Sequence, residues 1–176
     1  MQAFLLTNYN FFHILFLISQ AGSRGCYNVF KIYMEKKYTG KVRVHPIPKF
    51  YEGVHVDTCI SIIGYNKKVK KYIAIFEGVK ISNPTNIPAI FRGKNWAIIS
   101  FEKHIQHYML PDYEFTSFHM GLNILTINPE LVAVVDSATH LIETLDFYGI
   151  KSIVVTNRQM CHLCGGCHCN TNDINR

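Results

Sequence analysis

The run LNILTINPELVAVVDSATHLIETLDFYGIKSIVV, residues 122–155, decides the fold because it contains strand, strand, helix and strand in that order. Residues 122–127 and 131–135 are rich in Leu, Ile and Val, which is typical of strands, and Asn128-Pro129 between them is typical of a turn. These two segments are therefore predicted to pair as adjacent strands.

The second half of this run predicts a helix followed by a strand. Ser137 stands where a residue would cap a helix, and Gly149 stands where the helix would end. The apolar residues between them recur at helical spacing and form one stripe: Leu141, Ile142, Leu145 and Tyr148. Ile153 to Val155 then reads as a buried strand.

A looser version of the same order occurs earlier in the chain. A helix is predicted from Val29 to Tyr38, ended by Thr39-Gly40, and a strand is predicted from His55 to Ile63 with His55 and Asp57 on one face. The lysine-rich stretch at residues 67–71 would form a solvated hairpin turn before a strand at 72–76. The fold class is thus predicted to be α+β, built from similar strand-strand-helix-strand modules.

Composition limits the classes of function. The 176 residues, 48% of them hydrophobic, are enough for one packed domain. The net charge of +6 comes without a nucleic-acid recognition motif, so we expect no nucleic-acid partner. Phe11 to Ile18 is too short to span a bilayer, and residues 1–10 lack the basic residue of a signal peptide, so neither a membrane span nor a targeting peptide is expected.

Four of the six cysteines lie close together near the carboxyl end, at Cys161, Cys164, Cys167 and Cys169. The CxxCxxC spacing favours a metal or cluster site, since thiolates are preferred ligands of zinc and iron. A second hypothesis is a loop that presents one nucleophilic thiolate, Cys169, after the flexible Gly165-Gly166 pair. A third is that most of these cysteines are small core residues.

Several motifs, in order along the chain, resemble the later part of glycine amidinotransferase and its relatives, the arginine:glycine and inosamine-phosphate amidinotransferases. They are HVDTCISIIG at 55–64, ISNP at 81–84, the run at 122–155 and GGCHCNT at 165–171. The resemblance implies a partial pentein-type α/β propeller. It divides the chain into a divergent apolar segment, 1–18, and a partial amidinotransferase domain, 19–176.

The resemblance also implies site residues. Cys169 matches the family nucleophile, His55 the general acid/base, Asp57 a carboxylate that holds the cationic guanidino group, and Ser117 a serine that contacts substrate. The implied reaction moves an amidino group from arginine to an acceptor amine, glycine in creatine biosynthesis, through an amidino-cysteine intermediate. No cofactor and no metal are expected.

The implied partners are small-molecule substrates and a second copy of the chain in a homodimer. The implied compartment is mitochondrial, as for the animal enzyme, and otherwise cytoplasmic.

The chain departs from the family at several positions. Gln2 to Leu5 stand where a catalytic aspartate is expected, Asn86 replaces a carboxylate-binding arginine for which Arg92 is a candidate substitute, and Cys167 replaces a phenylalanine. A truncated, inactive chain fits these departures. Two alternatives therefore remain open: a catalytically dead pentein remnant that acts as a binding or pseudoenzyme subunit, and a cysteine-rich metal-binding module.

Overall fold

A computed structural model of the chain shows two compact units. One unit is formed by residues 1–56 and 83–92, and the other by residues 57–82 and 93–176. The structure describes the following residues: 3–8, 11–17, 24–47, 56–77, 87–101, 120–156 and 165–171. No helix in these described ranges is long and apolar enough to cross a membrane.

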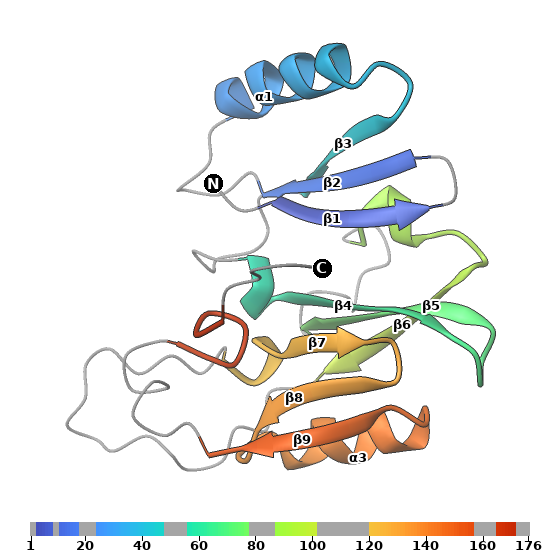
Figure 1. The fold of residues 1–176 in the computed structure, drawn as a ribbon, viewed down its shortest axis with the longest axis vertical. Coiled ribbons are helices and arrows are strands. Elements are labelled where there is room, and N and C mark those ends of the chain that lie inside the picture. The colour runs from blue at the N-terminus through green and yellow to red at the C-terminus, as the bar shows by residue number, and fades with distance from the viewer. Residues whose placement is uncertain are drawn as a thin grey trace. The chain divides into compact units, whose positions relative to one another are not determined.

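The described strands form three three-stranded sheets of identical topology (Figure 1). In each sheet the first two strands are antiparallel and the third is parallel to the second, which requires a crossover connection. The strands are β1 (Ala3–Asn8), β2 (Phe11–Leu17) and β3 (Val42–Ile47), then β4 (Ile60–Asn66), β5 (Lys71–Glu77) and β6 (Trp96–Phe101), then β7 (Leu125–Asn128), β8 (Leu131–Val135) and β9 (Lys151–Val155). The predicted α+β class is confirmed, and all three sheets repeat the strand order of the predicted module. Among the described residues, an α-helix follows the second strand in the first and third modules.

The first module lies in the first unit. Helix α1 (Arg24–Lys37) makes the crossover and packs its Tyr27 on alternate residues of β2 and β3. Gly40, at φ +70°, follows the helix where the sequence predicted its end, although the helix begins five residues before the predicted Val29. Strand β2 is the central strand of this sheet, so the segment 1–18 contributes to the module. The boundary predicted at residue 18 stays a prediction.

The second and third modules share one core in the second unit. Helix α3 (Thr139–Phe147) inserts Leu141 and Leu145, both fully buried, and Ile142 and Tyr148 pack against the same core. The predicted stripe is thus confirmed, as is the helix end at Gly149 with φ +74°. The core combines residues of β4, β5, β6, β8 and α3 with Cys167: Ile63, Ile73, Ile75, Ile99, Phe101, Val132, Val134, Val135, Leu141, Leu145 and Cys167.

Two sequence predictions are wrong in detail. Ser137 is not the helix cap, because the N-cap position is occupied by Ala138, which makes no side-chain capping bond. The final strand is not buried, because β9 lies at the end of its sheet and leaves Ile153 and Val154 about half exposed, at 46% and 53%. Between β5 and β6, Ala89–Phe91 forms the 3-10 turn η3.

The starts of two predicted strands are also wrong. The strand predicted from His55 begins at Ile60, because Val56–Thr58 forms the 3-10 turn η1. The strand predicted from Leu122 begins at Leu125, because Met120–Leu122 forms the 3-10 turn η4. In both places a buried polar side chain lies just before the strand, Asp57 in one and Asn123 in the other. These turns bring the two side chains together.

Hydrogen bonds between β4 and the segment around β7 hold these two strand starts side by side. The hydroxyl of Ser61 donates to the carbonyl of Leu122, and the hydroxyl of Thr126 donates to the carbonyl of Ile62 at 3.1 Å. Because Ser61 lies four residues after Asp57 and Leu122 immediately precedes Asn123, these bonds align the segments that carry Asp57 and Asn123.

The lysine-rich stretch forms the predicted hairpin turn between β4 and β5, but it is more than a solvated loop. Lys68 Nζ donates to the carbonyl of Phe147 at 2.6 Å, and Asn66 Nδ2 donates to the carbonyl of Tyr148 at 3.1 Å. These carbonyls lie at the carboxyl end of α3, where the helix dipole favours a cation. The turn of one module therefore caps the helix of the next.

We predict that Lys68→Met lowers the free energy of unfolding by about 1 kcal/mol, because the end of α3 loses its cationic cap. Lys70→Met, in the same turn, is the matched control and should change it by less than about 0.5 kcal/mol. Thermal unfolding followed by circular dichroism measures both. Equal effects of the two variants would show that Lys68 does not stabilise α3.

Candidate active site

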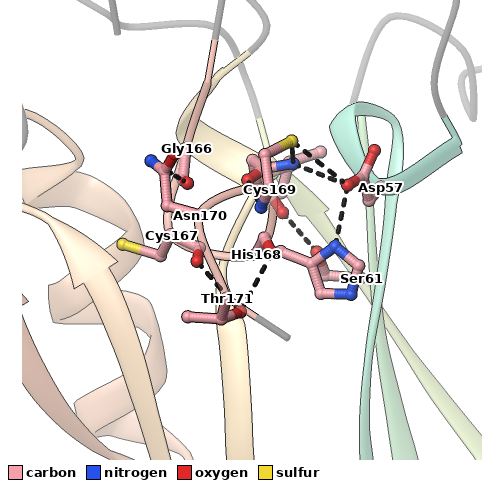
Figure 2. Close-up of polar contacts among 10 residues, drawn as sticks. Asp57, Ser61, Gly166, Cys167, His168, Cys169, Asn170 and Thr171 are labelled. Carbon is pink, nitrogen blue, oxygen red and sulfur yellow. Dashed lines mark hydrogen bonds and ion pairs between the residues drawn. The ribbon is translucent and has the colours of Figure 1, made fainter. Parts of the chain in front are cut away.

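The loop at residues 165–171 is a tight turn closed by its own hydrogen bonds. The backbone N–H of Asn170 and its side-chain Nδ2 both donate to the carbonyl of Gly166, at 3.3 and 2.8 Å. The hydroxyl of Thr171 donates to the carbonyls of Cys167 and His168. Cys167 is only 6% exposed and packs in the core, so it anchors the loop and points away from the exposed Cys169 (Figure 2).

Asn123 docks this loop onto the rest of the second unit. The N–H of Cys169 donates to Asn123 Oδ1 at 3.0 Å, and the N–H of His168 donates to the Asn123 carbonyl at 3.2 Å. A glycine is required at position 166 because the backbone there lies very close to Asn123. A Cβ at this position would lie 2.5 Å from Asn123 Cβ and Oδ1. Gly166 thus allows the loop to lie directly against Asn123.

One oxygen of Asp57 is the centre of the site (Figure 2). Asp57 Oδ2 accepts a hydrogen bond from Asn123 Nδ2 at 2.8 Å, lies 2.8 Å from His168 Nδ1, and accepts from Cys169 Sγ at 3.6 Å. Asp57 is only 3% exposed. A buried carboxylate requires partners of this kind, since desolvation penalises an uncompensated charge.

The histidine and the amide are oriented by this carboxylate. An ionised carboxylate only accepts hydrogen bonds, so Nδ1 of His168 must carry the proton that points to Asp57. The His168 side chain is about half exposed, at 43%, whereas that of Asp57 is 4% exposed. His168 therefore connects the buried carboxylate to the surface.

The thiol of Cys169 is held in its neutral form. Desolvation is the largest cause that raises the pKa of Cys169. Although the residue as a whole is exposed, its sulfur lies against Asp57 and Asn123 and is therefore partly desolvated. The Asp57 carboxylate also raises this pKa, while hydrogen bonds from the Gly166 backbone and from Asn123 Nδ2, 3.1 Å from Sγ, lower it. The pKa of Cys169 is raised on balance, so a further positive charge is needed to generate the thiolate near neutral pH.

Two of the four predicted site residues are brought together, because Cys169 and Asp57 share this cluster. The other two, His55 and Ser117, lie outside the described residues, and so do Asn86, Cys161 and Cys164. Arg92, the suggested substitute for the missing arginine, donates from Nε to the carbonyl of Ile87 at 2.7 Å. Within the described ranges, no group of three or more His, Cys, Asp or Glu side chains has the arrangement of a metal site.

Two residues of the cluster had no assigned role in the sequence analysis, Asn123 and His168. Both lie inside the segments that carry the resemblance. The signal for His168 was its position beside Cys169 in the GGCHC motif. Asn123 gave a weaker signal, a polar residue at the start of an apolar run, which is also typical of a turn.

Comparison with known proteins defines the class that this chain resembles in sequence and fold, the amidinotransferases. No protein-family model matches the chain. Inosamine-phosphate amidinotransferase 1 of Streptomyces griseus is 26% identical over 168 residues, which are 93% of this chain and 43% of that protein. The mitochondrial glycine amidinotransferase of Gallus gallus is 28% identical over 152 residues, 82% of this chain and 32% of that protein.

Solved structures agree at the level of fold. An amidinotransferase of the saxitoxin biosynthetic pathway from Microseira wollei superposes with a TM-score of 0.74 at 23% identity, covering 93% of this chain and 42% of that one. The inosamine-phosphate amidinotransferase of Streptomyces griseus gives 0.72 at 24% identity, covering 98% of this chain and 45% of that one. The predicted resemblance is confirmed, and the chain spans less than half the length of these relatives.

We predict that Asp57→Asn speeds the alkylation of Cys169 at neutral pH several-fold. The substitution removes a negative charge that raises the pKa of Cys169, so the thiolate fraction increases. Mass spectrometry of the Cys169 peptide after a brief iodoacetamide pulse measures the rate. Asp146→Asn, on α3, is the control and should leave the rate unchanged. Slower labelling of the Asp57 variant would contradict the electrostatic role given to this carboxylate.

Proposed function

We propose that this chain carries the thiol half-site of an amidinotransferase, with Cys169 as nucleophile, His55 as general acid/base, and Asp57 and Ser117 as substrate-binding residues. The observation that supports it best is the hydrogen-bonded cluster of Cys169, Asp57 and Asn123. The similarity to amidinotransferases supports amidino transfer as the general reaction.

The donor substrate is a guanidinium cation, so it would bring a positive charge to this cluster. A guanidinium cation placed against Asp57 offsets the negative charge of that carboxylate, which otherwise raises the pKa of Cys169. The thiolate then forms where the electrophilic carbon lies. Because the thiolate forms when the cation binds, Cys169 is reactive in the complex with substrate. Without substrate it remains a neutral thiol, which is a weak nucleophile.

The first half-reaction forms a carbon–sulfur bond and breaks a carbon–nitrogen bond. Cys169 Sγ attacks the guanidinium carbon, and His55 protonates the departing amine, which is too basic to leave as an anion. The product is an amidino-cysteine at Cys169 and a free amine, ornithine when the donor is arginine. No electron is transferred, so neither an oxidant nor a reductant is required.

The second half-reaction reverses these changes. An acceptor amine gives a proton to His55 and attacks the amidino carbon, the carbon–sulfur bond breaks, and the Cys169 thiolate is regenerated. Glycine is the acceptor implied by the resemblance, and exclusion of water separates transfer from hydrolysis. A homodimer, a mitochondrial location and a role in creatine biosynthesis are proposed on the same ground of resemblance alone.

We predict that arginine transfers one amidino group to Cys169. The protein is incubated with arginine, quenched in acid and digested, and the Cys169 peptide should gain the mass of an amidino group. Cys169→Ser should abolish this adduct, and His55→Ala should slow its formation by about 10²-fold or more, since general acid catalysis is worth that much.

Other outcomes identify the alternatives. An intact, folded protein that binds arginine without forming the adduct is a pseudoenzyme or binding subunit. Elemental analysis that finds one zinc or iron per chain, together with protection of Cys169 from iodoacetamide until a chelator is added, identifies the metal-binding module and excludes the nucleophilic role.

A further inference from the structure

Asn123 is the residue whose side chain hydrogen-bonds to both Cys169 and Asp57. A carboxamide has one carbonyl acceptor and two N–H donors, and Asn123 uses both ends. Its Oδ1 accepts from the N–H of Cys169 at 3.0 Å, while its Nδ2 donates to Asp57 Oδ2 at 2.8 Å and to Cys169 Sγ at 3.1 Å. Both N–H groups of the amide therefore have a partner in the site.

The orientation of this amide follows from its neighbours. A backbone N–H can only donate, so the atom that faces the N–H of Cys169 must be the oxygen of Asn123. The nitrogen of the amide then has to face Sγ and the Asp57 carboxylate. The opposite orientation would place two donors against each other and two oxygens against each other.

Packing keeps the amide in this orientation. Asn123 is 1% exposed, and the space beside its side chain is filled by the backbone of Gly166. The Asn123 carbonyl also accepts the N–H of His168 at 3.2 Å. The side chain has no room to turn away from the sulfur, so its N–H is preorganised.

We propose that Asn123 is a positioning residue for the Cys169 nucleophile, whose N–H stabilises the thiolate relative to the thiol. This inference rests on the proposed nucleophilic role of Cys169. A hydrogen bond to an anion is stronger than one to a neutral acceptor, so the contact gains strength when the thiol ionises. The contact with Asn123 also directs the thiol proton toward Asp57 Oδ2, because Asp57 Oδ2 can accept this proton and Nδ2 of Asn123 cannot.

Among the described titratable groups, Asp57 of η1 contacts the sulfur, and His168 of the loop contacts Asp57. Asp57 disfavours the thiolate by its negative charge, and His168 donates to Asp57. Asn123 bonds to both the thiol and the carboxylate, so it separates the two negative charges that exist once Cys169 ionises. Loss of Asn123 should raise the pKa of Cys169 while Asp57 stays in place.

The test is the pH dependence of iodoacetamide labelling at Cys169, measured peptide by peptide over a series that brackets the ordinary cysteine pKa. Asn123→Ala should move the midpoint upward and lower the rate at neutral pH on the order of tenfold, which corresponds to about one pH unit. Asn123→Asp keeps the shape, replaces the donor by a negative charge and should shift the midpoint further. The limiting rate at high pH should stay unchanged, since the thiolate itself is still present.

A matched control separates this effect from general loss of structure. Asn66 is also a buried asparagine of the same unit, 2% exposed, and its side chain bonds to the N–H groups of Lys68 and Val69 and to the carbonyl of Tyr148. Asn66→Ala should lower the unfolding temperature and leave the labelling midpoint of Cys169 where it was. Circular dichroism verifies that each variant is folded.

Gly166→Ala provides a second, independent variant in case Asn123→Ala fails to fold. It leaves every polar side chain of the cluster present, yet its Cβ would meet Asn123 at 2.5 Å and must displace it. The midpoint should then move in the same direction as in the Asn123 variants.

Three results decide whether Asn123 positions Cys169 and stabilises its thiolate. Upward shifts in the Asn123 and Gly166 variants, with none in Asn66→Ala, support the proposal. An unchanged midpoint in the Asn123 variants, or an equal shift in Asn66→Ala, overturns it while leaving Cys169 as a reactive thiol. If Cys169 of the unsubstituted protein reacts no faster than the buried Cys59, the proposed function fails and this inference fails with it.

Discussion

The single carboxylate oxygen Oδ2 of Asp57 accepts from an amide and a thiol and lies within hydrogen-bond distance of an imidazole nitrogen, and the arrangement of the site depends on it. Because an ionised carboxylate is acceptor only, each of these three groups has to present a proton to it. That requirement fixes the His168 tautomer, the direction of the Cys169 thiol proton and the orientation of the Asn123 amide. Asp57 is thus the acidic group of this cluster, and the proposed function places the cationic guanidino group of the substrate against it.

The repeated module explains how residues so far apart in sequence meet. Asp57 lies three residues before β4, and Asn123 lies two residues before β7, so the two residues have nearly equivalent places in the second and third modules. Hydrogen bonds from Ser61 and Thr126 align these strand starts, and the shared core holds both sheets. The loop after β9 then adds Cys169 to a site that two modules have already formed.

Much of this architecture could be predicted from the sequence, because helix α3, the β4–β5 hairpin and strands β5 and β8 follow clear hydrophobic patterns. The errors have physical causes. Residues 56–59 and 122–124 lie in segments whose sequence predicts strands, but their backbone turns so that Asp57 and Asn123 can meet. A tertiary hydrogen bond of this kind leaves no trace in local periodicity. The exposure of β9 follows from its place at the sheet edge, which its sequence does not encode.

Only part of the site could be predicted from the sequence, again because tertiary contacts leave no trace in a local sequence pattern. Cys169 and Asp57 were found through motifs that resemble amidinotransferases, whereas Asn123 acts through contacts 46 and 66 residues distant in sequence. The measurement that tests the account most directly is a carbon-13 NMR titration of cysteine-labelled protein, with Cys169→Ser assigning the signal. We predict that the pKa of Cys169 lies above the ordinary thiol value and falls when arginine is added. A pKa at or below the ordinary value, unaffected by arginine, would contradict it.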